Sequence, residues 1–238
     1  MLKADLHCHT LASAHAYSTL LELLTFAKRK GLSVLAMTDH GPALPDSPQI
    51  WHFRNLRTLP EEYDGIRLLR GVEANIMDEE GTLDLPDRIL SALEWVIASF
   101  HDDAYRGGDA AANTKTWLNI IKNPHVDMLG HPDRLPFVFD HETVIKACRE
   151  YGKVLEINNH SFRMTRGSVR DLEDIVRLCK KYDVLLGINS DAHVCFDVGE
   201  VSDAERLIND FGYNKDLVIN YSPEMILELV SKKRGTDG

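Results

Sequence analysis

The chain has 238 residues, of which 44% are hydrophobic and 27% charged, and its formal net charge is −10. This composition is typical of a globular protein and excludes a disordered or collagen-like chain. The acidic balance, without a basic stripe, argues against broad nucleic-acid binding, and no run approaches the roughly 20 apolar residues of a membrane span.

The predicted elements alternate between strand and helix from the first residues onward. Residues 2–9 form the first strand, and residues 17–30 form a helix with one apolar face and a glycine after its end. Residues 33–38 are a continuous apolar run, typical of a strand buried on both faces. Residues 41–60 contain four prolines and are predicted to form a long loop.

The same alternation continues to the end of the chain. Further strands are predicted over residues 68–75, 95–100, 126–130, 154–157 and 184–188. Further helices are predicted near residues 86–93, 113–122, 140–151, 168–182 (capped by Ser168), 200–210 and from Ser222 onward. Seven strands alternating with helices predict the α/β class with a parallel sheet, and the chain length is that of a closed (β/α) barrel.

The chain is predicted to be one domain, residues 1–238, because it shows no repeat, linker or low-complexity tract. The start leads directly into a strand, so no signal peptide is expected. The cysteines are scattered without a Cys-x-x-Cys pair, which predicts reduced thiols and a cytoplasmic protein. They are Cys8, Cys148, Cys179 and Cys195.

Residue types that bind metals recur where predicted strands end. His7 and His9 share one face of the first strand, about 6.6 Å apart. The later positions are His15, His40, Glu73, His101, His131, Asp191 and His193. Because the carboxyl ends of all strands open on one rim of a barrel, we expect these residues to converge on a metal site there. A cluster of unliganded imidazoles and carboxylates would carry a large desolvation cost, which favours metal binding over isolated core histidines.

Nine ligands exceed the needs of one or two ions, and Glu73 can bridge two ions through its two oxygens. The predicted division is His7, His9, Glu73 and Asp191 on one ion, Glu73, His101 and His131 on a second, and His15, His40 and His193 on a third. Nitrogen and oxygen ligands suit Zn, Mn or Fe. Cys8 points to the opposite face of the strand and is interpreted as packing.

The charges of such a site point to an anionic substrate. Three divalent ions and two carboxylates leave about +4, which attracts a compact anion such as phosphate. Clustered metals generate hydroxide near neutral pH and stabilise both oxygens of an in-line displacement. The pattern therefore favours phosphate-ester hydrolysis by a metal-bound hydroxide.

These motifs resemble the polymerase-and-histidinol-phosphatase (PHP) superfamily over nearly the whole chain. The matching stretches are residues 5–9, 38–41, 71–73, 131–132 and 190–193, with His101, and residues 16–19, 51–53 and 156–159 look like the YcdX-like branch of bacterial phosphatases. The resemblance implies a distorted (β/α)7 barrel, a trinuclear site of which zinc is the favoured metal, and phosphoesterase chemistry on a small phosphorylated substrate. A trimer is implied by the resemblance alone.

Residues beyond the ligands are predicted with roles of their own. Arg166 and Arg134 are the candidates for holding a substrate phosphate. Asp5 and Asp39 are expected to orient ligating imidazoles, and no side chain is assigned as proton donor. The remaining histidines are expected to have no role in the site. They are His52, His125, His141 and His160.

Three other readings stay open at this point. An amidohydrolase also begins with His-x-His, but it bridges its metals with a strand-borne lysine that this sequence lacks at a central strand end. An exonuclease on nucleic-acid ends conflicts with the acidic chain. A non-catalytic metal-binding module conflicts with the intact set of ligands.

Overall fold

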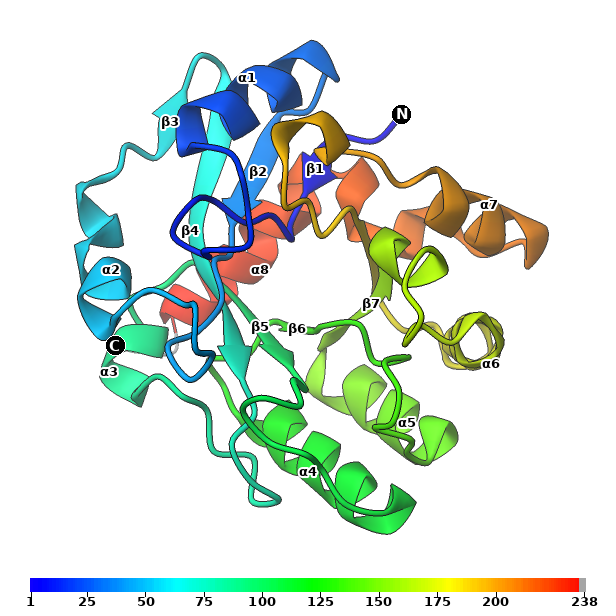
Figure 1. The fold of residues 1–238 in the computed structure, drawn as a ribbon. Coiled ribbons are helices and arrows are strands. Elements are labelled where there is room, and N and C mark those ends of the chain that lie inside the picture. Colours follow the sequence, from blue (N-terminus) through cyan, green and yellow to red (C-terminus); the bar gives the residue numbers. More distant parts are fainter. Residues whose placement is uncertain (236–238) are drawn as a thin grey trace.

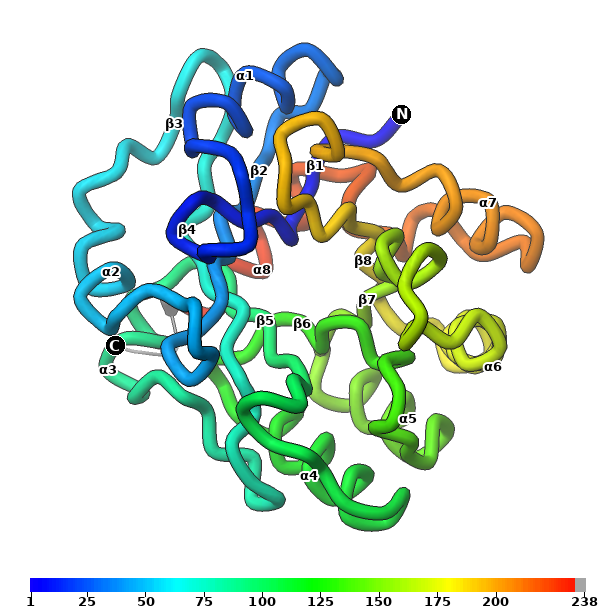
Figure 2. The backbone as a smooth tube through the Cα atoms, in the orientation of Figure 1, coloured from blue at the N-terminus to red at the C-terminus, as the bar shows by residue number. Residues whose placement is uncertain are grey.

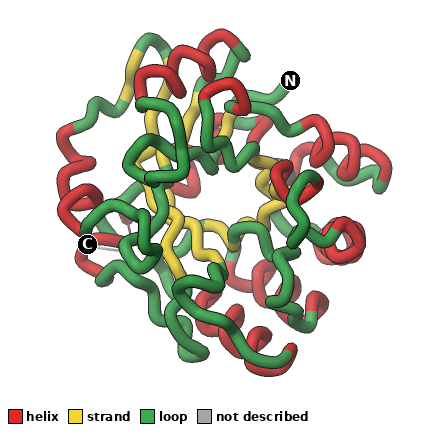
Figure 3. The backbone as a smooth tube through the Cα atoms, in the orientation of Figure 1, coloured by secondary structure: helices red, strands yellow, loops and turns green. Residues whose placement is uncertain are grey.

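A computed structural model describes the backbone of residues 1–235 and the side chains of residues 1–233. Seven parallel strands form a ring with helices outside it (Figure 3). In spatial order they are β1 (Ala4–Asp5), β2 (Val34–Met37), β4 (Ile66–Asn75), β5 (Trp95–Ser99), β6 (Met128–Leu129), β7 (Val154–Asn158) and β8 (Leu186–Asn189). The short β3 (Glu62–Tyr63) pairs antiparallel with β4.

The ring closes through contacts between its first and last strands. The backbone N–H of His9 donates to the carbonyl of Ala192 (2.9 Å), and Cys8 and Ala192 form an isolated parallel bridge. One step earlier, the N–H of Leu6 donates to the side-chain Oδ1 of Asn189 (3.0 Å) instead of to a backbone carbonyl. The predicted (β/α)7 barrel is therefore confirmed, and its distortion lies at this seam.

Helices cover the outside of the ring (Figure 1). They are α1 (Leu20–Arg29), α2 (Ile50–Asn55), α3 (Asp87–Leu90), α4 (Ala110–Lys122), α5 (His141–Tyr151), α6 (Val169–Tyr182), α7 (Ser202–Asp210) and α8 (Pro223–Gly235). The predicted cap of α6 is confirmed, since the Ser168 hydroxyl accepts the N–H of Asp171 (3.2 Å).

Two predicted spans differ from the structure. The predicted loop over residues 41–60 contains α2 and the 3-10 turn η1 (Leu56–Thr58), which are too short to show a clear helical period in the sequence. Strands β1 and β6 have two residues each, because side-chain contacts and an isolated bridge replace the regular ladder at the seam beside β1. No helix within residues 1–235 is long and apolar enough to cross a membrane.

The barrel interior is apolar at the amino ends of its strands, and α8 covers that end. Ile226 and Val230 of α8 pack in one buried cluster with Trp95 and other inward side chains. Lys233 of the same helix forms a buried ion pair with Asp127 (Nζ to Oδ2, 2.7 Å). Figure 2 shows α8 behind the ring, so the barrel is open only at the carboxyl ends of the strands.

All four cysteines are free and buried. Cys8 packs in the outer apolar cluster, as predicted from its position between the two histidines. The cytoplasmic location inferred from the cysteines stays a prediction.

Candidate metal centre

The open end of the barrel holds a cavity of about 620 Å³. Six of the nine predicted ligands line this cavity: His15, His40, His101, His131, Asp191 and His193. The other three, His7, His9 and Glu73, are fully buried and contact the lining residues directly. The strand ends therefore bring all nine side chains together.

Glu73 lies at the centre of this group, on the inward face of β4. Its Oε1 lies 2.8 Å from His131 Nε2 and 3.4 Å from His101 Nε2. Its Oε2 lies 2.7 Å from His40 Nδ1 and 3.3 Å from His7 Nε2. The two oxygens of one carboxylate thus face different sets of imidazoles, which is the geometry that a bridging ligand needs.

A second carboxylate completes the group around His7 and His9. Asp191 Oδ1 lies 3.0 Å from His9 Nε2 and 3.6 Å from His7 Nε2. Glu73 Oε2 lies 3.6 Å from the same His9 atom. Donor atoms that bind one ion at about 2.0–2.2 Å in a tetrahedron lie at roughly such separations from one another.

A third group lies at the rim. His15 Nε2 lies 2.9 Å from His193 Nε2 and 3.2 Å from His40 Nε2. The outer nitrogens of two of these rings are fixed by acceptors: His15 Nδ1 contacts an Asp46 carboxylate oxygen (2.6 Å), and His193 Nδ1 contacts the backbone carbonyl of Asp191 (2.9 Å).

These acceptors determine the tautomers. Carboxylate and carbonyl oxygens only accept, so Nδ1 of both His15 and His193 carries the hydrogen, and each neutral ring directs its Nε2 lone pair inward. Two lone pairs facing each other at 2.9 Å repel unless a cation lies between them. The rim group therefore fits a cation.

The same reasoning holds in the interior. His7 Nδ1 donates to Glu156 Oε1 (2.8 Å), and His101 Nδ1 donates to Asn75 Oδ1 (2.7 Å). The inward Nε2 of each ring then faces an oxygen of Glu73. Among the described residues, His7 Nε2 and Glu73 Oε2 are buried without a hydrogen-bond partner. Buried acceptors facing one another without donors are the arrangement that metal ions satisfy.

The electrostatics favour positive charge at the same place. Burial opposes ionisation of Glu73, but the surrounding His7, His101 and His40 outweigh it and hold the pKa of Glu73 well below its usual range. The pKa of Asp191 is lowered in the same way, against burial, by His7 and His9. Burial together with His40 and His193 lowers the pKa of His9 to about 3, so this ring keeps its lone pair at neutral pH.

Two candidate ligands have unusual backbone conformations. His131 has φ of 25° and Asp191 has φ of 54°, a region that residues other than glycine rarely adopt. Each follows a strand of the barrel directly. Such conformations persist where the surrounding structure fixes them, and they concentrate at functional sites.

The acceptors that orient the imidazoles are not the predicted ones. The prediction for Asp39 and Asp5 is wrong: Asp39 accepts from Thr10 and Ser13 and contacts His52 on α2, and Asp5 accepts from Ser190 and the N–H of Gly199. Both shape loops behind the ligands.

Glu156, which the sequence reasoning did not single out, has the predicted orienting role. Besides His7, it accepts the backbone N–H of His131 (2.7 Å) and the side-chain amides of Asn158 and Asn189. The signal for it was a charged residue within the apolar run of residues 154–157, since a buried carboxylate needs partners.

The two predicted phosphate-binding arginines line the same cavity. Arg134 Nε is buried without a partner among the described residues, and Arg166 forms an ion pair with Asp102 across the mouth. Their loops are joined, because the N–H of Leu135 donates to the carbonyl of Arg166 (2.8 Å). Of the histidines expected to have no role, His160 also lines the cavity, whereas His125 and His141 do not.

A parallel barrel whose open end gathers histidines and two carboxylates defines the class of metal-dependent hydrolases. The sequence matches the PHP domain over residues 5–233. The chain therefore belongs to the PHP domain family, and its relatives place it in the YcdX-like branch.

Curated relatives extend over almost the full length of the chain. A probable phosphatase of Caldanaerobacter subterraneus subsp. tengcongensis is 46% identical over 98% of this chain and 92% of its own length. A probable phosphatase of Shewanella sp. (strain ANA-3) is 43% identical over 96% of this chain and 91% of its own length. The chain is thus a probable phosphatase, an enzyme that hydrolyses phosphoric ester bonds.

Solved structures share the fold at low sequence identity. A histidinol phosphate phosphatase from Lactococcus lactis, solved with zinc, L-histidinol and phosphate, has a TM-score of 0.61 at 18% identity over 89% of this chain and 94% of that one. A chain of an archaeal ribonuclease P complex has a TM-score of 0.58 at 15% identity, over 98% of this chain and 90% of its own. Similarity at this level shows the fold alone.

Proposed function

We propose that the chain hydrolyses a phosphate monoester of a small molecule at a site of three divalent metal ions. The observation that carries the proposal is the set of fixed tautomers, which direct imidazole lone pairs at other acceptors in three places. The proposed ligands are His7, His9, Glu73 and Asp191 for the first ion, Glu73, His101 and His131 for the second, and His15, His40 and His193 for the third.

Nitrogen and carboxylate donors without thiolate favour zinc, and manganese and iron are also compatible. Such ions supply a metal-bound hydroxide near neutral pH and stabilise charge on the phosphoryl oxygens. The zinc and phosphate in the Lactococcus lactis structure support this choice, since the two chains share a fold.

The cavity favours a small monoester over a polynucleotide. Arg134 and Arg166 are proposed to hold the phosphate, because both guanidinium groups line the mouth and Arg134 has an unpaired Nε. Asp46, Asp102 and Asp103 line the same mouth and repel the backbone of a longer nucleic acid. An exonuclease is therefore the weaker candidate.

The other two readings have less support. No lysine lines the cavity among the described residues, so Glu73 is the group placed to bridge metals as an amidohydrolase lysine does. A non-catalytic module is disfavoured by the complete ligand set and by relatives named as phosphatases. We propose that residues 1–238 act as one phosphoesterase domain, and the trimer stays a prediction.

The test is a substrate panel on protein of measured metal content. We expect hydrolysis of 4-nitrophenyl phosphate to exceed that of bis(4-nitrophenyl) phosphate, a cyclic dipeptide-like amide and a single-stranded oligonucleotide, to disappear on chelation and to return with zinc or manganese. Cleavage of the amide or the oligonucleotide alone, by fully loaded protein, contradicts the proposal.

Two variants test the proposed phosphate-binding residues. Arg134→Gln and Arg166→Gln are expected to raise KM for the monoester by about 10- to 100-fold, as loss of a charge-assisted hydrogen bond predicts. Arg163→Gln is the control, because Arg163 is exposed near Arg166 and does not line the cavity. An equal KM in all three variants contradicts the assignment.

A further inference from the structure

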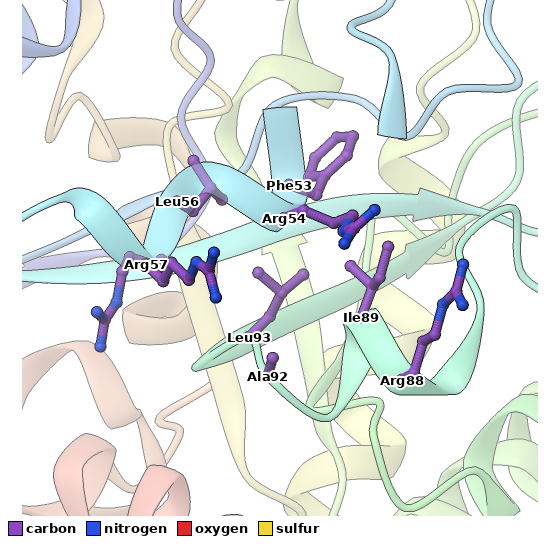
Figure 4. Close-up of a pocket in the computed structure, with 9 residues that line it drawn as sticks. Phe53, Arg54, Leu56, Arg57, Arg88, Ile89, Ala92 and Leu93 are labelled. Carbon is purple, nitrogen blue, oxygen red and sulfur yellow. The ribbon is translucent and has the colours of Figure 1, made fainter. Parts of the chain in front are cut away.

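A second cavity, of about 270 Å³, lies on the outer side of the barrel. It is formed by α2 and η1 on one side and by α3 with the turn after it on the other, and it shares no lining residue with the mouth cavity. Figure 4 shows Ile89 and Leu93 pointing toward the segment that carries Arg54 and Arg57. This volume is slightly below the usual range for small-molecule sites and fits a single ring with a short chain.

The floor of this cavity is apolar. Phe53 and Leu56 on one side, and Ile89 and Leu93 on the other, are each no more than 4% exposed. An apolar group placed between the two segments removes further hydrocarbon surface from water, which is favourable in proportion to the area covered.

The rim of the cavity is positively charged. Arg54, Arg57 and Arg88 are exposed, and no carboxylate among the side chains of residues 1–233 lies within ion-pair distance of any of them. The fourth arginine, Arg70, is held by Glu94 (2.7 Å) and Glu61 (3.4 Å). No acidic residue lines the cavity.

Arg54 has one further contact, because its guanidinium lies over the ring of Trp51 (4.7 Å). Three guanidinium groups without acidic partners at one cavity are notable in a chain of net charge −10. Guanidinium groups bind carboxylates and phosphates through paired hydrogen bonds, so the rim complements an anion.

We propose that this cavity binds a small amphipathic anion, with its apolar body between Phe53 and Leu93 and its carboxylate or phosphate group against the three arginines. Since the two cavities share no residue, the ligand binds while the mouth is occupied by substrate. The site is thus an effector site, separate from the reaction centre.

The probe is 4-phenylbutyrate, titrated into the full-length, metal-loaded protein and followed by amide NMR. We expect saturable binding with shifts at residues 53–57 and 88–93, unchanged when inorganic phosphate saturates the mouth. The neutral 4-phenylbutyramide should bind about 10- to 100-fold more weakly, because it cannot form charge-assisted hydrogen bonds. Absence of saturable binding, or competition with phosphate, overturns the proposal.

Variants at exposed positions separate this site from general charge effects. Arg57→Gln/Arg88→Gln should weaken the probe by about 10- to 100-fold, and Ala92→Glu should abolish binding by placing a carboxylate in the cavity. The matched control Arg149→Gln/Arg170→Gln removes the same charge from exposed positions on α5 and α6. Equal affinity in both double variants overturns the proposal, as does sedimentation showing that a second copy of the chain covers the cavity.

Discussion

Glu156 Oε1 accepts the Nδ1 hydrogen of His7 at 2.8 Å, and both side chains are fully buried. The same carboxylate accepts the backbone N–H of His131 through its other oxygen. One residue in the middle of β7 therefore fixes a proposed ligand of the first ion and the loop that carries a ligand of the second.

Removing the charge of Glu156 should loosen both ions. We expect Glu156→Gln to lower zinc affinity by about 10- to 100-fold, the usual effect of losing an outer partner of a ligating histidine. Affinity is measured by competition with a chelator, and Glu150→Gln, on the exposed side of α5, is the control. Unchanged affinity in Glu156→Gln would show that the contact does not orient His7.

The rim group should be separable from the interior groups. His193→Ala removes one of the nitrogens that meet His15 Nε2 and leaves His7, His9 and Glu73 in place. We expect the metal content, measured by elemental analysis, to fall from three ions per chain to two. His125→Ala, in a loop away from the cavity, should retain all three, and a loss of every ion in His193→Ala would refute independent sites.

Glu94 gives a pH-dependent contribution to stability away from the metal centre. Burial opposes its ionisation, but hydrogen bonds from Arg70 and Arg67 outweigh burial and lower the pKa of Glu94 below its usual 4.5. Because the folded-state pKa is the lower one, this contribution is present above about pH 4.5 and is lost as the pH falls through the lowered value.

The variant Glu94→Gln should therefore be less stable than the parent chain by about 2 kcal/mol at pH 7, the scale of a charge-assisted hydrogen bond. The difference should shrink below about pH 4.5. Denaturant unfolding of chelated protein across this pH range measures it, with Glu173→Gln as an exposed control. A difference that grows on acidification would reverse the predicted sign.

The ion pair between Lys233 and Asp127 should stabilise the covered end of the barrel. Lys233→Met leaves the buried carboxylate without its ammonium partner, and we expect a loss of about 3 kcal/mol in the free energy of unfolding. Adding Asp127→Asn should restore part of it, because the amide oxygen can still accept the N–H of Val96. Equal stability of the single and double variants would contradict this account.

The buried thiols should be chemically inert in the folded chain. Burial raises the pKa of Cys148 to about 12, so almost none of it is thiolate at pH 8. We expect iodoacetamide to leave Cys148 unmodified in native protein and to modify it fully in guanidinium, as mapped by mass spectrometry. Rapid native labelling would show that α5 opens readily.

Much of the site could be predicted from the sequence, because side chains at the ends of parallel strands meet at one rim whatever the details of the helices. His7, Glu73 and Asp191 converge for this reason. The contacts that orient them could not be placed, because Glu156 and Asn75 reach their histidines across 149 and 26 residues, and no local pattern encodes such pairing.

The ion pair between Arg166 and Asp102 and the arginine-lined cavity were not foreseen for the same reason. Each joins loops or short helices from separate parts of the chain, whose relative positions follow from packing and not from periodicity. The six-residue α2 shows how little signal such a short helix leaves among prolines and aromatic residues.

Because α8 seals one end of the barrel, everything that enters the reaction chamber must leave by the way it came. The alcohol has to depart first or pass the inorganic phosphate that is still held among the cations. Phosphate is therefore expected to be the last species released, and its escape past the Arg166–Asp102 pair to set the pace of turnover.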